Sequence, residues 1–438
     1  MSTALSTAKD SVIKSRDGVR ILTGFTIAHG IFHFMQQSFA VMLPAIKETF
    51  GISPIQIGAL MTAKEIAMGV SSLPGGVISD RLKRYRGIIM AACMALFGLS
   101  WLLIGTATIY SHLIIGLVFV SIATSVWHLP SMAEISRRFS DRKGASLAIF
   151  GIGGSFGDIF GPVITGILLG LLAWQNVISI YASIPLLMTL WFIWAFRGGR
   201  RTEQSEDLSA GKNVDLRTQI KIVKGYFKTT AIWKVNLVAG LRGMCYTIYV
   251  TFLPLFMKED LGFSSQSIGF HFGLLWAIGI VTSPLMGHLS DRLGRKPVLV
   301  PALLCSGILT ILLALFGKGI VFTVIIGMLG IFLRSDYALL SAAILDIVGQ
   351  KVATTMLGVL SFLRFIMASI SPLIAGYLYQ NWGMTATLFF TAALFAISAV
   401  IFSSADLKQP IHHNQNPARN QQGPGNVHDK PDDKHFRK

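Results

Sequence analysis

Apolar stretches of roughly 18 to 25 residues recur along the chain, and they constrain its fold more than any other feature. A helix of this length crosses the hydrocarbon core of a bilayer. Only 13% of the residues are charged, about half the share found in soluble domains. The sequence therefore predicts an all-α integral membrane protein with twelve transmembrane helices, and it excludes a soluble fold.

The apolar stretches fall into two groups of six. The expected spans are 20–46, 55–79, 87–107, 110–136, 144–171 and 174–196, followed by 231–257, 265–289, 297–316, 319–347, 352–379 and 382–403. We predict a cytoplasmic N-terminal segment (1–19), a six-helix bundle (20–196), a cytoplasmic linker (197–230), a second six-helix bundle (231–403) and a disordered cytoplasmic tail (404–438). The linker carries Leu216, Ile220, Val223 and Phe227 at near-helical spacing, which predicts an amphipathic helix at the membrane surface.

The net charge of +17 is unevenly distributed among the connections. Lys and Arg gather at 9–20, 81–86, 137–143, 197–234 and 292–296, whereas the alternate connections hold few or none. Basic connections stay in the cytoplasm. The alternation predicts a multi-pass protein of the bacterial inner (plasma) membrane with both termini in the cytoplasm. The basic residues thus indicate orientation in a lipid bilayer, and no nucleic acid is expected as a partner.

Residues about 210 positions apart match each other, which indicates an internal repeat. Pro44 corresponds to Pro254, an offset of 210, and Gly51 corresponds to Gly262, an offset of 211. The other matched landmarks are Ile57-Gly58 with Ile268-Gly269, Asp80-Arg81 with Asp291-Arg292, and Gly161-Pro162 and Gly166 with Ser371-Pro372 and Gly376. Parallel repeats of this kind are found in secondary transporters. The chain is therefore expected to consist of two related six-helix halves.

The loop between the second and third span of each half contains a motif that is typical of one family. Gly287-His-Leu-Ser-Asp291-Arg292-Leu-Gly294-Arg295-Lys296 matches the major facilitator pattern G-x-x-x-D-R-x-G-R-K. The first half carries Gly76-Val-Ile-Ser-Asp80-Arg81-Leu-Lys83-Arg84, with Lys83 in place of the second glycine. The chain resembles the major facilitator superfamily, and the resemblance implies the major facilitator fold for residues 20–403. It also implies that these two loops act as conformational gates.

Two further motifs refine the resemblance. Gly157-Asp-Ile-Phe-Gly161-Pro162-Val-Ile-Thr-Gly166 in the fifth span is similar to the helix-packing pattern associated with antiporters. The first half also resembles fosmidomycin-resistance exporters. The residues that carry this second resemblance include His29, Leu43-Pro44, Phe50-Gly51, Val126-Trp127-His128, Pro130 and Glu134. These resemblances imply export of a drug or small compound by a protein that works as a monomer.

Ionisable and polar residues inside the predicted spans are the candidates for substrate binding or coupling, because charge in the membrane is costly and is usually functional. They are His29, His33, Gln36, Gln37, Glu65, His128, Asp158, Arg242, Tyr246, Arg334, Asp336 and Arg364. Cationic groups outnumber anionic ones in this set, and Arg can donate two hydrogen bonds to one anion. An anionic or zwitterionic substrate is therefore expected.

Several of these residues also have a structural interpretation. Arg242 could form an interhelical salt bridge, and Arg364 could pair with Asp336 or Asp346. Glu65 could neutralise Lys64, although neighbours on a helix point about 100° apart, so a separate partner is expected for each. The histidines His29 and His33 could serve packing or proton coupling.

The function expected from the sequence is secondary active transport by alternating access, with proton-coupled export (antiport) of a small anionic or zwitterionic compound. The alternatives are proton-coupled uptake of an organic anion and a non-transporting membrane sensor. The sequence has no P-loop, no nucleophile motif and no cluster with metal-ligand spacing. No enzyme activity, no cofactor and no metal site are expected, and the proton gradient is the expected energy source.

Overall fold

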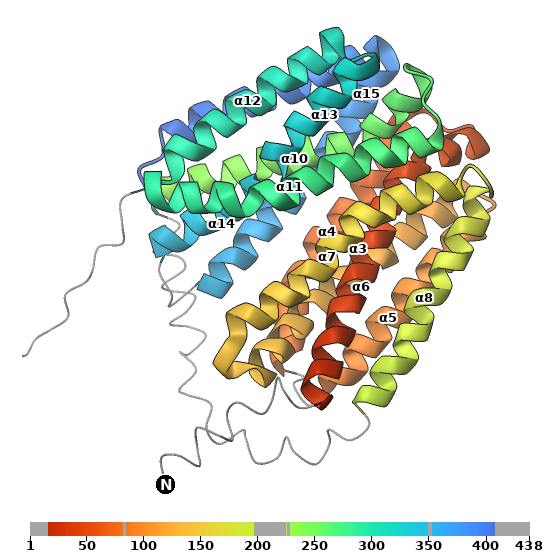
Figure 1. Cartoon of the computed structure of the whole chain (residues 1–438), viewed down its shortest axis with the longest axis vertical. Coiled ribbons are helices and arrows are strands. Elements are labelled where there is room, and N and C mark those ends of the chain that lie inside the picture. The colour runs from red at the N-terminus through yellow and green to blue at the C-terminus, as the bar shows by residue number, and fades with distance from the viewer. Residues whose placement is uncertain (1–15, 82–84, 197–224, 226–227, 349–352, 408–438) are drawn as a thin grey trace, which may run out of the picture.

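The computed structural model describes residues 16–81, 85–196, 225, 228–348 and 353–407, and every regular element within them is a helix (Figure 1). The first half contains α3 (Arg16–Phe50), α4 (Pro54–Arg81), α5 (Arg86–Gly105), α6 (Tyr110–Arg138), α7 (Lys143–Leu168) and α8 (Trp174–Ala195), with a short 3-10 turn between α6 and α7. The second half contains α10 (Thr230–Glu259), α11 (Ser265–Leu293), α12 (Arg295–Phe316), α13 (Gly319–Leu333), α14 (Ser335–Val348) and α15 (Ala353–Ser403). The predicted linker helix and tail, and the N-terminal segment up to residue 15, lie outside the described residues.

Two elements of the second half differ from single straight spans. The expected span 319–347 is divided at Arg334 into α13 and α14. At 51 residues, α15 would be roughly 77 Å long, which exceeds the thickness of a bilayer core. Its backbone leaves the helical region at Gly383 (φ 76°), between the two spans expected there. Taking α13 and α14 as one broken span and α15 as two gives six spans in each half.

Length and hydropathy identify nine of the helical stretches in the described residues as candidate membrane spans, and one of the nine is the double-length stretch Met356–Ser403. Large apolar side chains also lie exposed on the outer faces of the bundle, for example Leu187 on α8, Leu285 on α11 and Val400 on α15. In water such a surface would be a liability, but in a membrane it faces lipid. Length, hydropathy and surface agree on a multi-pass membrane protein.

Within the first half, α3 packs along α7, and α5 packs between α6 and α8. In the second half, α10 and α12 both pack on α15. The halves meet mainly through two helix pairs, α4 with α15 and α7 with α11, and α3 also touches α10. Figure 1 shows the first half in red to yellow and the second half in green to blue.

The residues matched in the internal repeat form these two interfaces between halves. A Cβ atom at Gly58 would overlap the Pro372 carbonyl oxygen, and a Cβ atom at Gly269 would overlap that of Pro162. These are corresponding contacts, because Gly58 matches Gly269 and Pro162 matches Pro372 in the repeat. Small residues let membrane helices approach to backbone contact. The repeat therefore encodes an approximately symmetric pair of close interfaces.

These interfaces lie toward one end of the bundle, which we call the Lys47 end (residues 47–54, 168–174, 259–265 and 379–383). There the Lys47 ammonium donates to Glu259 Oε1 across the two halves at 2.6 Å. Tyr379 donates to Asp260 at 2.8 Å and braces the same corner of the second half. The two halves are thus held together at the Lys47 end, opposite the end that carries the basic connections.

Candidate functional site

Asp158 lies at the centre of the contacts between the halves, on α7. Its neighbour Gly157 allows α7 to approach α3 so closely that a Cβ atom there would overlap the Gly30 carbonyl oxygen. Gly161, one turn further on, packs in the same way on Phe34, whose carbonyl oxygen would lie 2.5 Å from an added Cβ. The glycines of the α7 motif therefore bring the Asp158 carboxylate against α3 within the first half.

Three side chains bind the two oxygens of Asp158. His33 Nδ1 lies 2.8 Å from Oδ1, and Gln37 Nε2 donates to the same oxygen at 3.4 Å. Arg334 Nη1 donates to Oδ2 at 2.6 Å from the other half of the protein. The Asp158 side chain is only 5% exposed, whereas those of His33 and Arg334 are 33% and 26% exposed. A buried carboxylate is thus held by partners that remain partly accessible.

Arg334 lies between α13 and α14, within the single candidate membrane span Gly319–Val348. Its second terminal nitrogen, Nη2, donates to Ser155 Oγ at 3.0 Å. Ser155 was not among the residues expected from the sequence. It lies three residues before Asp158, which places both side chains on one face of α7, and that spacing is the signal that could have identified it. Arg334 therefore joins the halves through two contacts.

Gln37 extends this network to the second half. Its Nε2 also donates to the Tyr246 hydroxyl at 3.1 Å. The Arg364 guanidinium lies over the Tyr246 ring at 5.6 Å, over Tyr337 at 4.9 Å and over Phe365 at 5.1 Å. We call the six polar residues connected in this way the central network. They are His33, Gln37, Asp158, Tyr246, Arg334 and Arg364.

Arg364 differs from the other arginines of the central region in its surroundings. The expected carboxylate partners of Arg364, Asp336 and Asp346, are bound to Arg242 and to Arg295. That expectation was wrong, because the α14 carboxylates are already occupied by helices α10 and α12. Within the part of the chain that the structure describes, no carboxylate lies within 4.0 Å of the Arg364 guanidinium. Arg364 is therefore a partly buried cation held by aromatic rings.

Arg242 and Asp336 form a buried ion pair between α10 and α14. Their side chains are 6% and 2% exposed, and the Arg242 guanidinium also lies over the Phe395 ring at 4.4 Å. The structure therefore matches the salt-bridge interpretation of Arg242. Tyr249, one turn beyond Tyr246 on the same helix, is buried and bonds to Thr310 at 2.6 Å. Arg242 and Tyr249, on either side of Tyr246 along α10, are therefore bound within the second half.

Glu65 and Lys64 on α4 are bonded to each other, with Lys64 Nζ 2.9 Å from Glu65 Oε1. The expectation of a separate partner for each was wrong, because the flexible lysine side chain bends back across the helix surface to reach its neighbour. Gln36 Nε2 lies 3.5 Å from Thr124 Oγ1 on α6, and Gln36 and Lys64 line one small pocket with Phe39. These residues lie beside the central network without direct bonds to Asp158.

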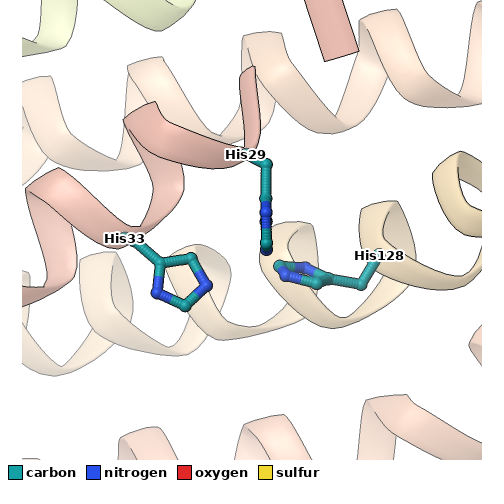
Figure 2. Close-up of side chains that lie close together, drawn as sticks. All are labelled: His29, His33 and His128. Atoms are coloured by element: carbon teal, nitrogen blue, oxygen red, sulfur yellow. The ribbon is translucent and has the colours of Figure 1, made fainter. Parts of the chain in front are cut away.

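His29 and His128 lie beside His33, although α6 and α3 are far apart in sequence (Figure 2). His29 Nδ1 is 2.8 Å from the Phe150 carbonyl oxygen, and its ring stacks on the Phe150 ring at 4.0 Å. His128 Nδ1 is 2.9 Å from the Thr124 carbonyl oxygen. One nitrogen from each of the three histidines lies within 4.8 Å of the other two.

The gate motif of the second half centres on Arg295. Its guanidinium bonds to Asp291 at 2.5 Å, to Ser290 at 3.1 Å and to Asp346 at 2.7 Å. Gly294 has φ 96°, a conformation that side chains other than glycine disfavour, and it turns the chain between α11 and α12. Gly287 is open to its surroundings and Arg292 is exposed. Arg295 thus links the ends of α11, α12 and α14.

The corresponding motif of the first half is described in part. Gly76, Asp80 and Arg81 belong to the last turns of α4, and Arg84 lies outside the described residues. In the α7 motif, Gly166 contacts α11, where an added Cβ would lie 2.5 Å from the Ser265 carbonyl oxygen, and Pro162 faces Gly269. The α7 motif therefore packs on α3 at one end and on α11 at the other.

Known proteins with similar sequences are membrane transporters. The family model of the Major Facilitator Superfamily matches residues 25–371 and 235–429. The fosmidomycin resistance protein of Escherichia coli is 23% identical, over 73% of this chain and 77% of that protein. The hexuronate transporter of Bacillus subtilis is also 23% identical, over 88% of this chain and 94% of that protein.

Among solved structures, a bacterial homologue of the human lysosomal transporter Spinster, in an inward-facing and occupied conformation, has a similar fold. The TM-score is 0.75 at 15% sequence identity, over 88% of this chain and 96% of that chain. The fold, the family match and these relatives agree. The chain therefore belongs to the major facilitator superfamily, as a secondary transporter and not an enzyme.

Proposed function

We propose that this protein transports a small organic anion across the membrane and couples its movement to protons. The observation that carries the proposal is Arg364, a partly buried guanidinium that aromatic rings hold in place. Desolvated charge needs a counter-charge, and a guanidinium can grip a carboxylate, sulfonate or phosphonate with two parallel hydrogen bonds. The similarity to a hexuronate transporter supports an anionic substrate, since hexuronate is itself a carboxylate.

Arg334 and Asp158 supply the coupling. Arg334 is connected to Arg364 through Asp158, Gln37 and Tyr246, so an anion held by Arg364 lies near the Arg334–Asp158 pair. An anion that takes the Arg334 guanidinium leaves Asp158 with His33 and Gln37 alone. A buried carboxylate that loses its cationic partner is stabilised by taking up a proton. Anion binding and proton binding then favour each other.

Such coupling loads anion and proton in the same state, which is the arrangement of a symporter. Uptake of an organic anion together with protons is therefore the function that this geometry supports best. Export by antiport, the function expected from the sequence, is the second candidate. It is favoured by the antiporter-like motif Gly157 to Gly166 and by the similarity to the fosmidomycin resistance protein. In antiport, proton and substrate would instead compete for Asp158 and Arg334.

Alternating access supplies the transport cycle in both candidates. The halves are held together at the Lys47 end, and the basic connections mark the opposite end as cytoplasmic by the positive-inside rule. We therefore assign the structure to an inward-facing state of a monomer in the bacterial inner membrane, with both termini in the cytoplasm. The proton gradient is the energy source of the proposed cycle.

The test is transport in liposomes that enclose a pH-sensitive dye. Purified protein is reconstituted, a panel of carboxylates, sulfonates and phosphonates is added outside, and internal pH is followed without an imposed gradient. Symport predicts internal acidification when a transported anion moves inward. Antiport predicts internal alkalinisation instead. Cationic drugs serve as the comparison class.

Two variants connect the flux to the site. Arg364→Ala should raise the anion concentration needed for transport, and Asp158→Asn should uncouple transport from protons, so that anion exchange persists while the pH change disappears. Lys318→Ala, which removes an exposed cation from the connection between α12 and α13, is the matched control. Proton-linked flux of cationic drugs that survives Arg364→Ala would contradict the anion assignment.

A further inference from the structure

Three histidines converge beside the central network. His29 and His33 are one turn apart on α3, and His128 reaches them from α6. Their ring centroids are separated by 4.6 Å, 5.0 Å and 6.2 Å, and one nitrogen from each ring lies within 4.8 Å of the other two. Figure 2 shows the three rings gathered in one place from two helices. We call this group the histidine cluster.

In each ring of the histidine cluster, Nδ1 is hydrogen-bonded to an oxygen atom of another residue, and this bond orients the ring. The partner is the Phe150 carbonyl for His29, the Thr124 carbonyl for His128 and the Asp158 carboxylate for His33, at 2.8 to 2.9 Å. These oxygens can only accept, so each Nδ1 must carry the hydrogen. In the neutral ring the lone pair is then on Nε2. Three lone pairs are thus fixed by the surrounding hydrogen bonds.

We propose that the histidine cluster binds one divalent transition-metal ion of the class of Zn²⁺. Three histidines with an open fourth position form a known type of zinc site, and a bond from the distal ring nitrogen to a carbonyl or carboxylate is the usual support of a metal-bound histidine. Neutral imidazole selects Zn²⁺, Ni²⁺ or Cu²⁺ over Mg²⁺ and Ca²⁺. The pair His33–Asp158 supplies a negative charge directly behind one ligand.

Binding of an ion would draw the three rings together. Tetrahedral zinc bonds of about 2.0–2.1 Å require ligand nitrogens roughly 3.4 Å apart, so the rings must move closer by about an ångström. The His33 side chain is 33% exposed, which gives the ion an entry path. Gly154 provides room, because a Cβ there would lie 2.8 Å from His29 Cε1 and 3.1 Å from His33 Cδ2.

The sequence predicted no metal site, because His128 is 95 residues from His33 and a two-histidine spacing on one helix is common without metal. The site shares His33 and Asp158 with the proposed transport network. Metal binding is nevertheless measured at equilibrium, without substrate or gradient. Loss of metal binding and loss of transport can therefore be separated experimentally.

The test is Zn²⁺ and Co²⁺ titration of the full-length protein, purified in detergent through an affinity tag that contains no histidine. The tail histidines His412, His413, His428 and His435 are replaced by Gln in every version, because they could bind metal themselves. Zn²⁺ is titrated in competition with a chromophoric chelator, and Co²⁺ is followed by its visible absorption. We expect one ion per chain and a Co²⁺ spectrum of the intense, tetrahedral type.

Variants assign the ligands. His29→Ala, His33→Ala and His128→Ala should each weaken Zn²⁺ binding at least tenfold, and Asp158→Asn should weaken it about 10- to 100-fold through His33. The matched control is His271→Ala, a buried histidine of α11 that bonds to Thr323 instead. Arg364→Ala should keep full zinc affinity although its anion transport is weakened.

Three results would overturn the metal site, and the first two concern stoichiometry and affinity. One is a stoichiometry near zero in the tail-substituted protein. The other is an unchanged affinity in the three histidine variants. His33→Gln, which keeps a hydrogen bond to Asp158 but supplies no imidazole, distinguishes loss of a ligand from misfolding, and thermal unfolding of each variant verifies the fold. Retained zinc binding in His33→Gln would also contradict the proposal.

Discussion

The arginines Arg364 and Arg334 differ in the partners of their guanidinium groups. Arg334 is bound to Asp158, whereas Arg364 lies over aromatic rings. We predict that Arg364→Ala raises the KM for the transported anion about 10- to 100-fold, since a hydrogen bond to a charged group is worth about 1.5–3 kcal/mol. Arg364→Lys should recover only part of this loss, because an ammonium lacks the planar fork. The measurement is the concentration dependence of anion flux. An unchanged KM in Arg364→Ala would remove this residue from the binding site.

The buried pair of Arg242 and Asp336 has a different expected behaviour. Removing one partner leaves an uncompensated buried charge, so Arg242→Met or Asp336→Leu alone should destabilise the protein by about 3–5 kcal/mol. The double variant replaces both charges with apolar side chains and should recover most of the stability. Thermal unfolding in detergent measures all three. A double variant as unstable as the singles would mean that the pair does more than balance charge.

Which residues would be polar and buried was predictable from the sequence, but their partners were not. Asp158, Arg334 and Arg364 were identified by charge inside an apolar span. Their pairing depends on how each helix is rotated against helices more than a hundred residues away, and spacing along one helix gives only its own faces. Ser155 was missed for another reason, because a serine has no charge that would identify it inside an apolar span.

At the scale of helices, the close contacts of α4 with α15 and of α7 with α11 are expected to hold the Lys47 end closed. We predict that Gly58→Ala and Gly269→Ala separate these helices and shift the population toward a state open at this end. The reason is the overlap of the new Cβ with the carbonyl oxygens of Pro372 and Pro162. Distances between spin labels report the change, with labels on α4 and α15 for Gly58→Ala and on α7 and α11 for Gly269→Ala.

The control for this prediction is Gly151→Ala on α7, where an added Cβ meets nothing within 4 Å. Equal label distances in Gly58→Ala and Gly151→Ala would show that the glycine contacts do not set the conformational balance. These interfaces were partly predictable, because the repeat identified the glycines and prolines as corresponding residues. The expected span 319–347 corresponds to the candidate membrane span Gly319–Val348, in which α13 and α14 follow each other directly.

For the whole molecule, the repeat was sufficient to predict two six-helix halves, and the orientation drawn from the charge of the connections stays a prediction. The conformational state was not predictable, because one sequence must support both an inward-open and an outward-open arrangement of the same halves. What distinguishes the two states is the set of contacts at each end. In this structure the ion pair of Lys47 and Glu259 joins the halves at the Lys47 end.

A cross-link at this pair tests alternating access directly. We predict that Lys47→Cys with Glu259→Cys, joined by a short bifunctional thiol reagent, stops transport, because the halves can no longer separate at the Lys47 end. Cleavage of the link by reductant should restore it. The background replaces Cys93, Cys245 and Cys305 by Ala. The control pair is Asp260→Cys with Tyr379→Cys, whose contact lies within the second half, so its cross-link should leave transport intact. Full transport by the cross-linked Lys47–Glu259 pair would mean that the substrate crosses without opening of this end, and alternating access about it would have to be abandoned.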